Sequence, residues 1–127
     1  MVKHLPYRYR DDSRIAAEAS LAARDQGKFR EMHLLLLERS PKLDRASLIG
    51  CAQALKLDVS RFTKDLDTMR HQREIDGDLK LANTLDLYNT PTIFINGVKL
   101  LGDRPIDEYR TVIDRELKAA GRGANIR

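Results

Sequence analysis

The sequence contains a single cysteine, Cys51, and this scarcity excludes several kinds of chemistry. One thiol cannot form a disulfide within the chain, and dithiol exchange needs a second thiol to resolve the mixed disulfide. A multi-cysteine zinc site is excluded for the same reason. Cys51 falls on an apolar stripe in the middle of a predicted helix, where unpaired cysteines are commonly buried. We therefore predict that Cys51 is a buried structural thiol without a redox role.

Long apolar runs are also missing from the sequence. No stretch approaches the roughly 18 apolar residues that a helix needs to cross a bilayer. The N-terminal residues likewise lack the hydrophobic core of a signal peptide. We expect no membrane partner for this chain. The sequence does not assign the protein to a compartment, because a signal peptide could have been removed together with upstream sequence.

The three histidines are too few and too scattered to suggest a metal site. His4 and His71 are isolated, without carboxylate or thiol partners at a suitable spacing. His33 lies on the same predicted helix face as Phe29 and Leu36, which predicts a histidine in the core or at its boundary. We expect neither a metal ion nor an organic cofactor.

The charge of the chain is only mildly positive, with a formal net charge of +4 and a pI near 9.4. Basic and aromatic residues alternate only between Lys3 and Arg10, which we interpret as a solvated connector, so we expect no nucleic-acid partner. Asp11 and Asp12 are suited to capping a helix. Five acidic residues farther along the chain are expected on solvated helix faces; they are Asp65, Asp67, Glu74, Asp76 and Asp78.

Helical periodicity dominates the chain, whose 127 residues suit one domain with a modest core. Capping residues and breakers predict about six helices. The first helix begins at Asp12 or Ser13 and ends at Gly27, and the second spans Lys28–Arg39. The third and fourth follow caps at Asp44 and Asp58. The fifth spans about Met69–Leu87, and the last begins at Pro105. Val2–Leu5 is predicted to be a strand that Pro6 ends. Residues 121–127 are expected to form a disordered tail.

A hairpin is predicted between the last two helices, over Thr92–Leu101. Pro91 opens an apolar, β-branched run, and the pair Asn96–Gly97 tolerates the positive φ angles of a two-residue turn. Pro91 lacks an N–H, so the start of a strand suits it. A Thr90–Pro91 turn facing solvent would let the Thr90 backbone pair with an extended peptide. Because an isolated hairpin is marginally stable, Val2–Leu5 is expected to share its sheet, giving an α/β fold.

Three segments of this chain resemble the C-terminal two-thirds of a DsbA-like thioredoxin-fold thiol–disulfide oxidoreductase. They are residues 2–6, residues 27–33 with the order Gly-Lys-Phe-Arg-Glu-Met-His, and residues 90–97 with the order Thr-Pro-Thr-Ile-Phe-Ile-Asn-Gly. The likeness extends over roughly residues 2–118, including the last helix. It implies a single incomplete thioredoxin-like domain over residues 1–120, with a helical insertion at about 12–87 and a truncated sheet.

The resemblance also implies a site and a set of partners. Pro91 would belong to a cis-proline loop, and Thr90 and Pro91 would be the peptide-contacting pair. The partners would then be unfolded or extended protein substrates, bound by strand-like backbone pairing. Relatives of this kind act in a periplasmic or extracytoplasmic space and use no organic cofactor.

The chain departs from the family pattern at its front. The family places a strand and a Cys-x-x-Cys helix before the position of Val2, and these 127 residues contain neither. The chain alone is therefore expected to be redox-inactive, with no catalytic residue among its 127 positions, and whether it belongs to an enzyme stays open. Unpaired sheet edges could also support a homodimer. The alternatives are a non-catalytic peptide-binding or assembly module and, more distantly, a glutathione-transferase-like or 2-hydroxychromene-isomerase-like relative.

Overall fold

A computed structural model describes residues 1–8 and 10–124. In this part of the chain it has six helices and one small antiparallel sheet, so the protein is mostly helical, as predicted. The chain divides into two compact units, which we call the helical unit (residues 1–84) and the hairpin unit (from residue 85 onward). Each unit is described by itself.

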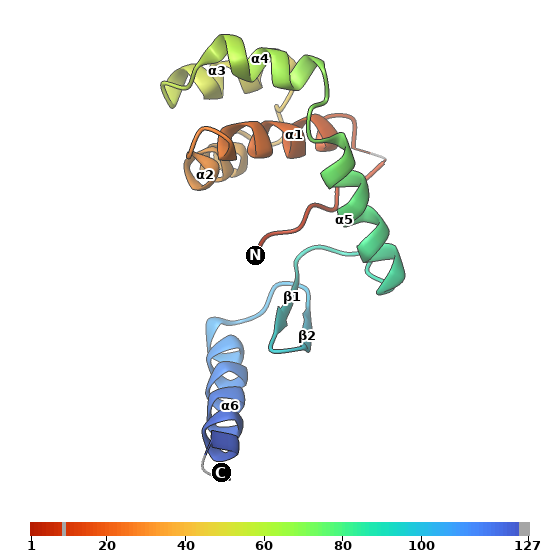
Figure 1. The fold of residues 1–127 in the computed structure, drawn as a ribbon, viewed down its shortest axis with the longest axis vertical. Coiled ribbons are helices and arrows are strands. Elements are labelled where there is room, and N and C mark those ends of the chain that lie inside the picture. The colour runs from red at the N-terminus through yellow and green to blue at the C-terminus, as the bar shows by residue number, and fades with distance from the viewer. Residues whose placement is uncertain (9, 125–127) are drawn as a thin grey trace. The chain divides into compact units, whose positions relative to one another are not determined.

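The helical unit is built around its first helix. Its elements are α1 (Ser13–Arg24), α2 (Phe29–Arg39), α3 (Arg45–Ala54), α4 (Val59–Asp67) and α5 (Gln72–Thr84). α1 contacts each of the other four helices, and Figure 1 shows it lying between α2 and the α3–α4 pair. Most of the buried face of α1 is alanine, which lets neighbouring helices approach closely.

The core of the helical unit places small residues of α1 against large ones from α2, α3 and α4. Phe62, Met32 and Leu48 are fully buried beside these alanines. Cys51 is fully buried in the same cluster, which confirms the predicted structural thiol. A second, smaller cluster joins Ile75 of α5 to Leu21 of α1.

Local capping signals are correct at three helix ends. The Asp44 carboxylate accepts a hydrogen bond from the Ser47 N–H, and the Asp58 carboxylate accepts one from the Arg61 N–H. Gly27 follows α1 with a φ of +74°, and the next amide, of Lys28, returns to the Ala23 carbonyl. Asp12 occupies the N-cap position of α1, but its side chain makes no capping hydrogen bond.

The predicted strand at Val2–Leu5 is wrong. The sheet contains only β1 and β2, and residues 2–5 have no strand structure. They are instead held by one buried carboxylate of α5. The Lys3 ammonium donates to Asp78 Oδ1 at 2.8 Å, and the His4 N–H donates to Asp78 Oδ2 at 2.9 Å. The Asp78 carboxylate therefore holds this segment, which was expected to pair with another strand.

The hairpin unit consists of β1 (Thr92–Ile95), β2 (Val98–Leu101) and α6 (Ile106–Ala124). β1 and β2 pair antiparallel, with Ile95 opposite Val98, and the intervening Asn96 and Gly97 have φ angles of +49° and +84°. The predicted hairpin and its two-residue turn are confirmed. Among the described side chains from residue 85 to 121, none is buried. Residues 85–121 therefore form no buried core of their own.

The bounds of two predicted helical features differ from the structure. α5 ends at Thr84, three residues before the predicted end at Leu87, and Asp86 beyond it has a φ of +52°. Residues 121–124, expected to belong to a disordered tail, are part of α6, which continues to Ala124. The rest of that tail, residues 125–127, lies outside the described residues.

Replacing Gly77 with alanine is expected to stabilise the helical unit by about 0.5–1 kcal/mol, because glycine is a poor helix former. Gly77 lies inside α5, and an added Cβ would meet no atom within 4 Å. Urea unfolding followed by circular dichroism measures the change. The matched control is Gly27→Ala, where the φ of +74° should make the same change destabilising. A loss of stability in Gly77→Ala would contradict this account of α5.

Candidate functional site

The loop predicted to contact peptides lies at the open end of the hairpin. Thr90 and Pro91 are exposed and directly precede β1, and the peptide bond between them is cis. The Pro91 carbonyl accepts a hydrogen bond of 2.8 Å from the Gly102 N–H, which extends the ladder beyond β2. The Thr92 hydroxyl donates to the Asn89 carbonyl at 2.7 Å and closes the turn before the strand. Pro91 is therefore held in line with β1.

The hairpin has one aliphatic face and one mixed face. The register places Ile93 opposite Leu100 on the aliphatic face, with Ile95 and Val98 on the same side. On the mixed face Phe94 pairs with Lys99 and Leu101 pairs with Thr92, and Phe94 and Leu101 are 46% and 49% exposed. The exposed Phe94 and Leu101 therefore mark a face that the described chain leaves uncovered within this unit.

The last helix lies beside the aliphatic face of the hairpin and leaves a shallow groove. A space of about 290 Å³ is bounded by Ile95 and Asn96 of the hairpin and by Ile113 and Leu117 of α6, among others. The Asn96 amide donates to the Glu116 carboxylate at 2.9 Å across this contact. Ile113 and Leu117 nevertheless remain 42% and 64% exposed. The apolar stripe of α6 is thus only partly covered by the hairpin.

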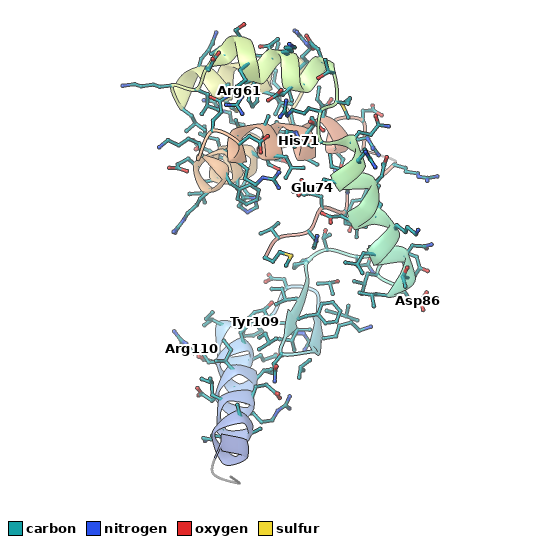
Figure 2. All side chains as sticks on the ribbon, in the orientation of Figure 1. Arg61, His71, Glu74, Asp86, Tyr109 and Arg110 are labelled. Carbon is teal, nitrogen blue, oxygen red and sulfur yellow. The ribbon has the colours of Figure 1, made fainter. Side chains whose placement is uncertain are left out.

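Polar groups near the loop come from the segment that leads into it. The Tyr88 hydroxyl donates a hydrogen bond of 3.1 Å to the Asp86 carboxylate, and this bond raises the pKa of Tyr88 above its ordinary value. Figure 2 labels Asp86 in this segment and Tyr109 and Arg110 on α6. Tyr88 is 64% exposed, so its ring adds to the apolar surface of the hairpin unit. The loop can offer backbone pairing and apolar contact to a ligand.

A reactive group is not found beside this loop in the described residues. Cys51 belongs to the helical unit, has no exposed surface, and lies 3.5 Å from the Arg39 guanidinium. The described residues also contain no group of three or more potential ligands that could hold a metal ion. No helix in this part of the chain is long and apolar enough to span a membrane.

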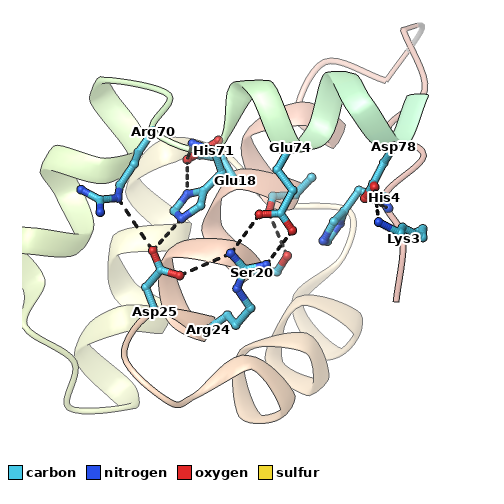
Figure 3. Close-up of polar contacts among 11 residues, drawn as sticks. Lys3, His4, Glu18, Ser20, Arg24, Asp25, Arg70, His71, Glu74 and Asp78 are labelled. Atoms are coloured by element: carbon cyan, nitrogen blue, oxygen red, sulfur yellow. Dashed lines mark hydrogen bonds and ion pairs between the residues drawn. The ribbon is translucent and has the colours of Figure 1, made fainter. Parts of the chain in front are cut away.

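A buried polar cluster in the helical unit corrects several sequence predictions. His71, predicted to be isolated, is buried between the carboxylate of Glu18 in α1 and that of Asp25, the C-cap residue of α1. Its Nδ1 lies 2.6 Å from Glu18 Oε1 and its Nε2 lies 2.7 Å from Asp25 Oδ2 (Figure 3). Asp65 and Asp78, expected on solvated faces, are also buried. These groups are placed by contacts between helices, which the spacing within one helix does not reveal.

His33 was predicted to lie in the core or at its boundary, but it is exposed on α2. Its ring stacks on Phe29, with ring centroids 6.1 Å apart. His4 approaches the same Phe29 ring edge-on at 6.4 Å. Burial lowers the pKa of His4 below its ordinary value, and the nearby Asp78 and Glu74 only partly oppose this. The two histidines share an aromatic contact at the surface of the helical unit.

Comparison with known proteins gives the family. The family model described as a DSBA-like thioredoxin domain matches residues 3–114. The chain belongs to this family. The match runs from the N-terminal segment through all five helices of the helical unit and the hairpin to the first half of α6.

Curated relatives of this chain are much longer proteins. The chain is 40% identical over 101 residues to Na(+)/H(+) antiporter NhaA 1 of Salinispora arenicola, covering 80% of this chain and 16% of that protein. It is 38% identical over 123 residues to Na(+)/H(+) antiporter NhaA of Herminiimonas arsenicoxydans, covering 97% of this chain and 19% of that protein. The chain thus spans less than a fifth of the length of these relatives.

Solved structures share the fold of the chain. A thioredoxin-like oxidoreductase from Silicibacter pomeroyi superposes with a TM-score of 0.80 at 26% identity, covering 91% of this chain and 66% of that one. Oxidised BdbD from Bacillus subtilis superposes with a TM-score of 0.77 at 25% identity, covering 88% and 65%. About a third of each of these chains has no counterpart here. The fold is therefore thioredoxin-like, of the DSBA type.

Proposed function

We propose that this chain is the helical and peptide-contacting portion of a DsbA-like thiol–disulfide oxidoreductase whose two reactive cysteines lie on a segment outside these 127 residues. The observation that carries the proposal is the incompletely covered hairpin. Apolar side chains are exposed on both of its faces, and none of its described side chains is buried. A hairpin of this kind needs further strands or helices to be stable. The unmatched third of the two oxidoreductase structures is large enough to supply them.

The role assigned to Thr90 and Pro91 is to hold extended polypeptide beside the reactive sulfur. Both residues are exposed where β1 begins, so a peptide could continue the strand pairing there by backbone hydrogen bonds. Backbone pairing depends little on side chains, which suits a protein that acts on many unfolded substrates. Phe94 and Tyr88 would add apolar contact. The proposed location is extracytoplasmic, where protein disulfides persist.

The chemistry of disulfide exchange explains why the chain alone would be inactive. A thiolate attacks one sulfur of the substrate disulfide, and the other substrate sulfur leaves as a thiolate. A second protein thiol then attacks the mixed disulfide and releases the substrate in reduced form. The one thiol of this chain is buried in the core of the helical unit. It can neither reach a protein substrate nor resolve a mixed disulfide.

The chain alone is expected not to accelerate the reduction of insulin by dithiothreitol. Turbidity from precipitating insulin chains measures the rate, and the Cys51→Ser variant is the matched control. Both proteins should give the rate of the buffer. Acceleration by the natural chain that disappears in Cys51→Ser would overturn the assignment of Cys51 and, with it, the proposal that the reactive sulfur lies elsewhere.

A non-catalytic peptide-binding or assembly module is the second candidate, and the burial of the only cysteine favours it. In this case the exposed hairpin surface would bind a partner protein or a second copy of the chain, without redox chemistry. The source gene separates the two candidates. A reading frame that continues upstream through a strand and a Cys-x-x-Cys motif supports the oxidoreductase, and a frame that starts at Met1 supports the module.

A further inference from the structure

The turn of the hairpin contains an asparagine followed by a glycine, a pair that readily loses the side-chain amide in water. Asn96 and Gly97 have φ angles of +49° and +84°, and both residues are exposed. The strand pairing ends at Ile95 and Val98, so the Gly97 N–H lies outside the ladder. Glycine has no side chain to shield its nitrogen, and a Cβ added at Gly97 would meet no atom within 4 Å. The Gly97 nitrogen is therefore accessible as a nucleophile.

The side chain of Asn96 links the hairpin to α6. Its amide donates to Glu116 Oε2 at 2.9 Å, while Glu116 Oε1 accepts from Arg115 at 3.1 Å. The hydrogen bond from Asn96, together with that from Arg115, lowers the pKa of Glu116 below its ordinary value, so this acceptor is ionised at neutral pH. The groove beside this hydrogen bond is bounded on α6 by the apolar residues Ile113 and Leu117. Asn96 therefore supplies a polar link at the edge of an apolar contact.

The reaction expected at this pair needs only water as a co-reactant. The Gly97 nitrogen attacks the side-chain carbonyl carbon of Asn96, and the new C–N bond closes a cyclic imide. The bond from that carbon to the side-chain nitrogen breaks, and this nitrogen leaves as ammonia with the proton of the Gly97 N–H. A water molecule then opens the imide at either of its carbonyls. The product is an aspartate, or an isoaspartate whose backbone contains an additional carbon.

The hairpin has to open transiently for this attack to take place. The hydrogen bond to Glu116 holds the Asn96 side chain, and the ladder holds the backbone on both sides of the turn. None of the described side chains of residues 85–121 is buried, so little apolar burial opposes the opening. The reaction is therefore expected to proceed from the folded chain under ordinary conditions.

We propose that Asn96 is a site of spontaneous deamidation, and that its conversion loosens the contact between the hairpin and α6. Conversion replaces an N–H donor with a carboxylate that faces the ionised Glu116, so a hydrogen bond becomes a contact between like charges. An isoaspartate product also lengthens the two-residue turn, which disturbs the register of β1 and β2. The released ammonia is lost to the solvent, so the change is one-way. This inference goes beyond the proposed function and does not depend on it.

Ageing of the natural chain in neutral buffer tests the site. Ion-exchange chromatography separates the converted protein by its additional negative charge, and fragmentation mass spectrometry locates the change. Conversion is expected at Asn96, while Asn83 and Asn89, each followed by threonine, should stay intact over the same period. The chain unfolded in guanidinium chloride gives the reference rate, and the folded chain should react within about tenfold of it. A folded Asn96 that stays intact while the unfolded chain converts would overturn the proposal.

The variant Asn96→Gln is the matched control for the chemistry. Glutamine keeps an amide donor at this position, but its longer side chain would have to close a larger imide ring, which forms far more slowly. The variant should therefore stay intact at position 96 during the period in which the natural chain converts. Equal rates in the two proteins would refute attack by the Gly97 nitrogen.

Hydrogen exchange of the α6 amides measures the structural consequence. In Asn96→Asp, the amides of residues 112–117 should exchange about three- to tenfold faster than in the natural chain, because repulsion replaces the hydrogen bond to Glu116. Adding Glu116→Gln to this variant should restore the natural rate, since the new amide can donate to the new carboxylate. Equal exchange in the natural chain and Asn96→Asp, or no recovery in the double variant, would overturn the proposed loss of contact.

Discussion

Replacing Phe62 with alanine is expected to lower the free energy of unfolding of the helical unit by about 3–5 kcal/mol, the usual loss for a buried phenylalanine. Phe62 is fully buried in the cluster that joins α1, α2, α3 and α4. The facing residues of α1 are alanines, whose side chains have no freedom to fill the cavity. Urea unfolding followed by circular dichroism measures the loss.

The matched control for Phe62→Ala is Leu37→Ala on α2. Leu37 is a large apolar residue, but it is 64% exposed, so its truncation should change stability by no more than about 0.5 kcal/mol. A loss below about 1 kcal/mol in Phe62→Ala would mean that the helical unit does not depend on this core. Such a result would contradict the architecture described for residues 1–84.

Features that depend on neighbouring residues could be predicted from the sequence. Asp44 and Asp58 cap helices because their carboxylates reach amides three residues away. Asn96 and Gly97 form the hairpin turn because they tolerate positive φ angles. The burial of Cys51 follows from its place on an apolar helical stripe. In each case the determining interaction lies within one turn of helix or one hairpin.

Features that depend on distant residues were missed. Val2–Leu5 was predicted to be a strand, but a strand needs a neighbour, and these residues are anchored to Asp78 about 75 positions away. The partners of His71 lie 46 and 53 positions from it. One local signal for this cluster was present. Glu18 is an acidic residue within an alanine-rich, buried stretch of α1, and a buried carboxylate requires a partner.

The candidate site likewise has one feature that local sequence predicts and one that depends on distant parts of the protein. The Thr90–Pro91 loop was identified from the residues around it and from its likeness to a family, and the structure places it at the exposed start of β1. The lack of any buried side chain among the described residues 85–121 could not be predicted. Periodicity shows which residues are apolar, but it does not show whether another part of the chain covers them.

An N-terminal extension with the family's strand and Cys-x-x-Cys helix is expected to protect the hairpin against opening. In the chain alone, the exposed Phe94 and Leu101 stabilise nothing beyond the hairpin, so its amides should exchange readily. A new strand and helix would bury these side chains. The amides of β1 should then exchange about 100-fold more slowly, equivalent to about 3 kcal/mol of opening free energy.

Hydrogen exchange of the β1 amides, compared between the chain alone and the extended chain, measures whether a further segment covers the hairpin. Strong protection is expected in the extended chain, and none from an extension of equal length made of glycine and serine. Protection of β1 in the chain alone, or no gain from the strand and helix, would show that the hairpin does not depend on a further segment and would refute the proposed function.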